Sequence, residues 1–256
     1  MFEEGNRCTK RTVPRSAVFL LCAAVIGLIL AACGGGKEEA PATPTVSGSP
    51  AATVSSQAVS FQTADGLTIH GHLFGSGEKI VILCHMRPSD QTSWYGFAEE
   101  LAKAGYSALT FDFRGYGESE GKKELSKIDL DVEAAIAAMR ERGFGSIYLV
   151  GASMGGTASL IVAAREDVAG VVTISAPARF EDLNAEEVVG QVAERKLLIA
   201  SEGDSSAMTS LERLFEQAPE PKEKKVFEGS EHGTNLLEGE HGEELKAAIM
   251  VFLAGP

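Results

Sequence analysis

The chain has 256 residues, which suffices for one α/β domain and an additional N-terminal segment. Hydrophobic residues make up 44% of it and aromatic residues 7%, as in a globular protein rather than a disordered one. The formal net charge of −13 argues against a nucleic-acid partner, because binding to the phosphate backbone requires clustered Lys and Arg.

The first 32 residues follow the pattern of an export signal. Basic residues lie between Arg7 and Arg15, and residues 17–32 then carry no charge. This uncharged run is shorter than the roughly 20 apolar residues that span a bilayer, so it suits a signal-peptide core better. It ends in the sequence LAAC, which resembles the lipobox of bacterial lipoproteins. The resemblance implies a signal peptide over 1–32 and lipid attachment at Cys33; an uncleaved signal anchor is the alternative.

A lipid at Cys33 would place the protein on the extracytoplasmic side of the bacterial cell membrane. Lipoproteins carry several acyl chains on this cysteine, and two or more chains anchor a protein firmly. Cleavage would change the charge balance to 19 − 34 = −15, because four basic and two acidic residues are lost, so basic attraction to lipid would not contribute. Residues 33–57 are rich in Gly, Pro, Ala, Thr and Ser and predict a flexible tether. The folded domain is expected over 58–256.

Within that domain, strand and helix patterns alternate. Two β-type segments flank Asp65-Gly66, a hairpin signal. Short apolar runs then predict strands at 80–84, 107–113, 146–150, 170–175, 196–200 and 224–227, and amphipathic segments predict helices at 94–104, 128–142, 155–165, 207–217 and 242–253. Near-continuous β-branched runs favour strands covered on both faces, hence a mostly parallel sheet of about eight strands. The link between 175 and 196, with one helix-like piece at 185–192, leaves no room for a large lid.

Ser153 is the first candidate for chemistry. It lies in the run GASMG, after the predicted strand 146–150 and before the predicted helix that begins at Gly155. This is the strand–turn–helix setting that the Gly-x-Ser-x-Gly motif requires. The small residues allow a sharp turn, and the nearby helix N-terminus favours developing negative charge.

Cysteine and histidine side chains give no sign of a metal or redox centre. Cys84 is the only cysteine of the predicted domain, and its place at the end of an apolar run favours a small buried residue. His70 and His72 share one face of an early strand, but zinc needs three or four ligands and no third one is evident. We therefore expect no metal site.

Five features in order resemble the α/β-hydrolase superfamily over residues 60–253, nearly the whole predicted domain. They are His85-Met86, the loop Asp112-Phe113-Arg114-Gly115-Tyr116-Gly117-Glu118-Ser119, the elbow at Ser153, Asp204 and His232. Where similar hydrolases usually have His-Gly, this chain has His85-Met86, and Ser201 replaces the glycine of the Gly-x-x-Asp pattern that ends in Asp204. The resemblance implies an α/β-hydrolase fold with helices on both faces of the sheet.

The same resemblance assigns roles to individual residues. In the order Ser, acid, His, the nucleophile is Ser153, the acid Asp204 and the base His232. Glu202 is the alternative acid, and Asp204 could instead only cap the helix that follows it. His241 lies at the start of the last helix and suits a solvated position better than the base. The N–H groups of Met154 and Met86 would form the oxyanion hole, with the position of Met86 less defined; His85 would be structural.

A site of this kind hydrolyses a carboxylic ester or related acyl bond of a small molecule through an acyl-enzyme, without metal or organic cofactor. Two alternatives remain at this point. The same triad serves acyl-peptide and thioester bonds, and a surface-tethered binding protein could use the scaffold without turnover, because a fold does not fix a function. The loop from Asp112 to Ser119 is expected to be a packing feature beside the site.

Overall fold

The computed structural model describes residues 55–255 of the chain. The predicted signal peptide, Cys33 and all but the last three residues of the predicted tether lie outside this part. The first strand begins at Ser56, two residues before the domain start expected from the sequence. Within 55–255, no helix combines the length and apolarity needed to cross a bilayer.

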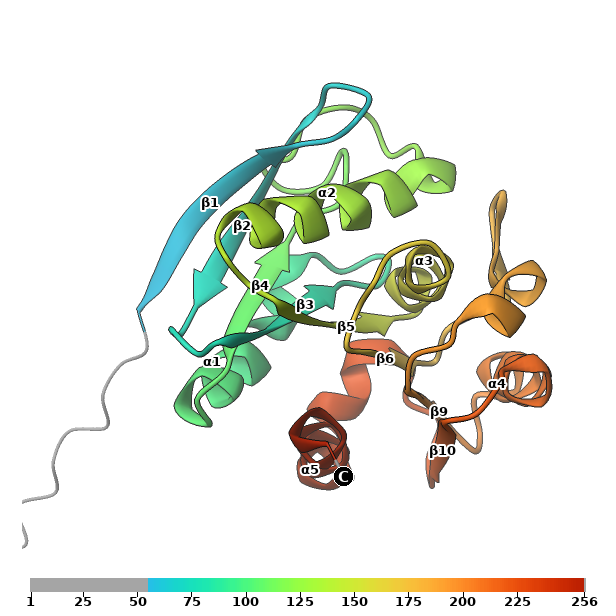
Figure 1. Cartoon of the computed structure of the whole chain (residues 1–256). Coiled ribbons are helices and arrows are strands. Elements are labelled where there is room, and N and C mark those ends of the chain that lie inside the picture. Colours follow the sequence, from blue (N-terminus) through green and yellow to red (C-terminus); the bar gives the residue numbers. More distant parts are fainter. Residues whose placement is uncertain (1–54, 256) are drawn as a thin grey trace, which may run out of the picture. The chain divides into compact units, whose positions relative to one another are not determined.

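An eight-stranded, mostly parallel sheet forms the centre of the domain, in the spatial order β1-β2-β4-β3-β5-β6-β9-β10 (Figure 1). β1 and β2 form the predicted antiparallel hairpin, β2 also pairs antiparallel with β4, and the pairs from β4 to β10 are parallel. The strands are β1 Ser56–Gln62, β2 Thr68–Phe74, β3 Lys79–Cys84, β4 Ser107–Phe111, β5 Ser146–Ala152, β6 Gly170–Ile174, β9 Lys196–Ser201 and β10 Lys222–Phe227.

Helices cover both faces of this sheet. Successive residues of β3 point to opposite faces, so Ile80 and Ile82 join one apolar cluster while Val81 and Leu83 join the other. Residues of α2, α3 and α4 contribute to the first cluster, and residues of α1 and α5 to the second (Figure 1). The helices are α1 Tyr95–Lys103, α2 Ile128–Glu141, α3 Met154–Ala163, α4 Ser205–Gln217 and α5 Gly242–Ala254. The predicted mostly parallel sheet of about eight strands with helices on both faces is confirmed.

The segment between β6 and β9 is short and holds no large lid, but it differs from the prediction in detail. The predicted helical piece at 185–192 consists of two short 3-10 turns, Ala185–Glu187 and Val189–Gln191. A segment this short, with Gly190 inside it, is a poor α-helix. Before these turns, β7 (Arg179–Phe180) and β8 (Leu183–Asn184) form a small hairpin that the sequence pattern did not indicate. Further 3-10 turns are Gln91–Trp94, Leu125–Lys127 and Gly233–Leu237.

Candidate active site

Ser153 occupies a sharp turn between β5 and α3. Its backbone has φ 49° and ψ −120°, a conformation that L-residues rarely adopt and that marks stored strain. The Ser153 N–H donates to the Ile174 carbonyl of the neighbouring strand β6 at 2.8 Å, which fixes the turn to the sheet. A Cβ at Gly151 or Gly155 would collide with backbone atoms, Gly155 with those of Cys84 and His85. The glycines therefore let the turn approach its neighbours, and the Ser153 hydroxyl lies at the carboxyl edge of the parallel strands.

His232 joins Ser153 to a carboxylate. It lies in the loop after β10, with Nε2 at 2.8 Å from Ser153 Oγ and Nδ1 at 2.6 Å from Asp204 Oδ2. A carboxylate only accepts hydrogen bonds, so Nδ1 carries the proton that is donated to Asp204. In the neutral imidazole Nε2 is then the acceptor for the Ser153 hydroxyl. The side chain of His232 is 39% exposed and that of Asp204 10%, so the site opens to solvent on the histidine side.

Asp204 serves two partners with its two oxygens. While Oδ2 accepts from His232, Oδ1 accepts from the Ala207 N–H at 3.2 Å and thereby caps α4. Both sequence interpretations of this residue, acid partner and helix cap, therefore describe the same carboxylate. The side chain of Glu202, the alternative acid, is exposed, and it is Asp204 rather than Glu202 that bonds His232 Nδ1.

Ser201 connects the loop of Asp204 to the loop of His232, a contact that no sequence pattern predicts. Its buried hydroxyl donates to the carbonyl of Glu231 at 2.7 Å, directly before His232. The backbone reinforces the connection, because the Gly203 N–H donates to the Gly229 carbonyl at 2.7 Å. The only signal for this role of Ser201 in the sequence is that a serine replaces the glycine of the Gly-x-x-Asp pattern. The hydroxyl holds the two loops at the spacing that the Asp204–His232 bond requires.

Met154 and Met86, the oxyanion donors that the sequence predicts, lie at the start of α3 and just after β3. The first N–H groups of a helix have no partner within the helix, and the helix dipole is positive there. In residues 55–255 we find no acceptor for the N–H of Met86, although this residue is buried. The Met86 side chain packs against Gly233, the residue after His232, so this loop borders the histidine.

His85 holds the Met86 loop in place. It is fully buried, with Nδ1 at 2.9 Å from the Met86 carbonyl, while Nε2 accepts from the Phe113 N–H at 3.1 Å. These bonds occupy both ring nitrogens, and burial lowers the pKa of His85. The ring is thus a neutral structural element. Its centroid lies 4.9 Å from the ring centroids of both Phe113 and Tyr116.

The loop from Asp112 to Ser119 is a dense hydrogen-bonding unit rather than a ligand loop. Its buried Arg114 donates to both Asp131 (2.7 Å) and Asp65 (2.8 Å), which joins the β1–β2 hairpin to α2. The hydrogen bond from Arg114 lowers the pKa of Asp65 to about 2. Asp65 therefore contributes stability that is fully present above the unfolded pKa of about 4 and is lost as pH falls through about 2.

Replacing Arg114 with glutamine should lower the free energy of unfolding by about 3 to 5 kcal/mol, because the carboxylate of Asp131 would stay buried without its cation. Chemical denaturation measures this change. As a control, Arg165→Gln removes two ion pairs, with Asp129 and Glu133, of an arginine that is 45% exposed, and should cost only about 1 kcal/mol. Equal losses in the two variants would contradict the role assigned to Arg114.

His70 and His72 belong to no group of potential metal ligands in the described part of the chain. His72 Nδ1 instead lies 3.0 Å from the Tyr95 hydroxyl and 3.2 Å from Gln91 Oε1. Gln91 in turn donates to Asp112 through its side-chain amide at 2.6 Å. The histidine is therefore part of the polar network that supports the loop after β4.

The comparisons with known proteins agree with this architecture. Residues 79–198 match the family model described as alpha/beta hydrolase fold. Alpha/beta hydrolase GrgF from Penicillium sp. sh18 superposes with a TM-score of 0.68 at 18% identity, over 77% of this chain and 97% of that one. An esterase from Pyrococcus furiosus superposes with a TM-score of 0.67 at 20% identity, over 78% and 91%. The protein has the α/β-hydrolase fold.

Sequence similarity to curated proteins covers 78% of this chain for uncharacterized protein YfhR of Escherichia coli at 21% identity, and a smaller part for a relative of higher identity. Bifunctional epoxide hydrolase 2 of Sus scrofa is 32% identical over 93 residues, which are 36% of this chain. The match spans 17% of that relative, far less than two thirds of its length. Such a partial match does not extend to the activity of the relative, so the chemistry of this chain depends on its own site.

Proposed function

We propose that the protein is a serine hydrolase that cleaves a carboxylic ester or related acyl bond through an acyl-enzyme intermediate. The observation that carries the proposal is the continuous hydrogen-bonded chain from Ser153 through His232 to Asp204. A serine hydroxyl is a weak nucleophile until a base accepts its proton, and the base needs an orienting carboxylate. This arrangement supplies both, on the same edge of the sheet as the N-terminus of α3.

In acylation, Ser153 Oγ attacks the carbonyl carbon of the substrate while its proton passes to His232 Nε2. Asp204 stabilises the resulting imidazolium through Nδ1. The negative charge that develops on the carbonyl oxygen is held by the N–H groups of Met154 and Met86. Collapse of this intermediate breaks the acyl bond, and the leaving group takes the proton from His232.

In deacylation, a water molecule takes the place of the leaving group. His232 accepts its proton, the hydroxide oxygen bonds to the acyl carbon, and Ser153 leaves with the proton returned by His232. The products are a carboxylic acid and free enzyme. The exposure of His232 supports this step, because water can reach the base directly.

A fluorophosphonate probe tests the proposal without knowledge of the substrate. The wild-type protein should be labelled covalently, and Ser153→Ala should not. Ser175→Ala is the matched control, since Ser175 follows the neighbouring strand β6 and its buried hydroxyl has no partner among the described residues. This variant should label like the wild type. Labelling that is equal in wild type and Ser153→Ala would refute the assignment of the nucleophile.

For the segment outside the described residues, we propose cleavage after Ala32, a lipid on Cys33 and anchoring on the extracytoplasmic face of the cell membrane. The lipobox sequence supports it. Expressed at full length in a bacterium, the wild-type protein should partition with membranes. Cys33→Ser should be released, because it lacks the acyl chains that anchor the protein stably. Cys8→Ser is the control and should remain membrane-bound. Membrane retention of Cys33→Ser would instead favour an uncleaved signal anchor.

A further inference from the structure

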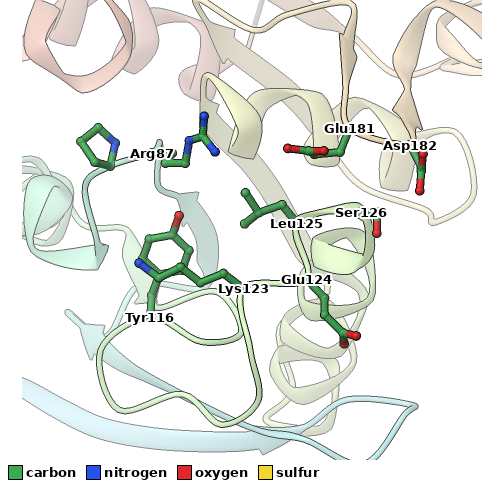
Figure 2. Close-up of a pocket in the computed structure, with 9 residues that line it drawn as sticks. Arg87, Tyr116, Lys123, Glu124, Leu125, Ser126, Glu181 and Asp182 are labelled. Carbon is green, nitrogen blue, oxygen red and sulfur yellow. The ribbon is translucent and has the colours of Figure 1, made fainter.

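A pocket of about 840 Å³ is lined by residues other than Ser153, Asp204 and His232, which form the proposed catalytic site. The two are joined by one loop, because Met86 packs against Gly233 next to His232 and the following residue, Arg87, lines the pocket. The other walls come from the loop after β4, the turn before α2 and the tip of the β7–β8 hairpin (Figure 2). An ester held at Ser153 would extend along this loop to reach the pocket.

Two cationic side chains in the pocket lack a carboxylate partner. Neither Arg87 nor Lys123 forms an ion pair with any residue of 55–255. The Lys123 ammonium lies 3.9 Å from the centre of the Tyr116 ring, and the Arg87 guanidinium 5.9 Å from that of Phe180. Contacts with ring faces leave the N–H donors of both cations free for an anion.

The Tyr116 hydroxyl is a third donor at this wall. Tyr116 is only 4% exposed, and its hydroxyl has no hydrogen-bond partner among the described residues. A buried hydroxyl without a partner is costly, and it indicates a group that the protein alone does not supply. The hydroxyl lies at the end of the ring that faces Arg87 (Figure 2). Burial raises the pKa of Tyr116 and Arg87 opposes this rise, so the hydroxyl stays protonated as a donor.

The acidic residues of the pocket do not cover this wall. Glu124 pairs with Lys127 at 3.4 Å, and Figure 2 shows the carboxylates of Glu124 and Asp182 directed away from Tyr116. Glu181 is different, because its carboxylate extends from the hairpin tip toward the side of Arg87. The pocket thus has a wall of donors and one opposing carboxylate.

From this arrangement we infer that Arg87, Lys123 and Tyr116 form a subsite for an anionic group, and that the preferred substrates are esters carrying a second, negatively charged substituent. The inference rests on the proposed hydrolase function and adds the substrate class. Charge-assisted hydrogen bonds from Arg and Lys give such a subsite its selectivity. The overall charge of −13 would otherwise repel anionic esters, so selectivity has to come from these local cations.

Matched ester pairs test the subsite. Mono-4-nitrophenyl adipate and 4-nitrophenyl hexanoate differ by an anionic group on the acyl part, and 4-carboxyphenyl and 4-methylphenyl butyrate differ in the same way on the alcohol part. In at least one pair, Arg87→Gln and Lys123→Gln should each lower the anionic-to-neutral ratio of kcat/KM about tenfold. Glu181→Gln should raise it, and added salt should reduce it in the wild type. Lys122→Gln, an exposed neighbour outside the pocket, should leave it unchanged.

The anionic subsite and the hydrolase function can be refuted separately. Hydrolysis of both members of each pair, with ratios that Arg87→Gln and Lys123→Gln do not change, would overturn the subsite and leave the hydrolase. Calorimetry on Ser153→Ala with the adipate monoester measures binding without turnover. Arg87-dependent binding without any hydrolysis by the wild type would support the subsite and refute the esterase function. Absence of both binding and turnover would overturn both.

Discussion

Replacing Ser153 with alanine should reduce kcat for ester hydrolysis by roughly 10⁶-fold, because the acyl-enzyme can no longer form. Ser153 and His232 act together in one proton transfer. The Ser153 hydroxyl lies 2.8 Å from His232 Nε2, the base that takes its proton in acylation, so removal of either partner disables the same step. Steady-state and single-turnover assays with 4-nitrophenyl esters at enzyme concentrations high enough to detect residual activity measure the loss.

The double variant Ser153→Ala/His232→Ala provides the internal control. If both residues act in one step, it should be no slower than Ser153→Ala alone, because the two losses are not additive. Unfolding curves of wild type and Ser153→Ala should nearly coincide, since only one hydroxyl is removed from a turn fixed by backbone bonds. A Ser153→Ala enzyme with a tenth or more of wild-type turnover would contradict the proposed mechanism.

The second large effect separates the two roles of Asp204. Asparagine is as good a helix N-cap as aspartate, so Asp204→Asn should keep α4 capped while the hydrogen bond to His232 loses its charge and its control of the tautomer. We expect kcat to fall by about 10⁴-fold with little change in stability. Asp204→Ala should show the same loss of activity and, in addition, a loss of about 1 kcal/mol in the free energy of unfolding.

Glu202→Gln is the matched control, two residues away and likewise a charge-neutralising change. Its side chain is exposed, whereas the Asp204 carboxylate bonds to His232 Nδ1 at 2.6 Å. Activity of Glu202→Gln should stay within about twofold of the wild type, as for a surface substitution away from the reacting groups. Loss of turnover in Glu202→Gln with activity retained in Asp204→Asn would transfer the acid role to Glu202.

The fold was accessible from local sequence patterns. Apolar runs of five or six residues rich in β-branched side chains are typical of strands buried on both faces, and β3, β5, β6 and β9 formed where these runs predicted them. The segment before β9 was less predictable. The helix-like piece at 185–192 is too short to show a helical periodicity. The β7–β8 hairpin has two residues per strand, too few for a recognisable alternation.

The candidate residues could be predicted from their order in the chain, but the contacts between them could not. Asp204 was predicted as the acid, with a helix cap as the alternative, and only the position of the loop after β10 beside the end of β9 brings His232 to its second oxygen. The role of the Ser201 hydroxyl is likewise visible only in the folded protein, where it donates to the Glu231 carbonyl. The pocket wall of Arg87, Tyr116 and Lys123 comes from two loops, one after β3 and one after β4, and leaves no sequence pattern.

By itself, the sequence determined the strand and helix order and the sharp turn that holds Ser153 between small residues. These follow from short-range chemistry: side-chain periodicity, backbone space and turn residues. The order of its partners, Asp204 and then His232, came from the resemblance to the α/β-hydrolase superfamily. Only the tertiary structure decided which carboxylate faces His232, which loop fixes the Met86 N–H and where two cations remain without a counter-charge. Those properties depend on contacts between segments far apart in the chain, which parallel strand pairing brings to one edge of the sheet.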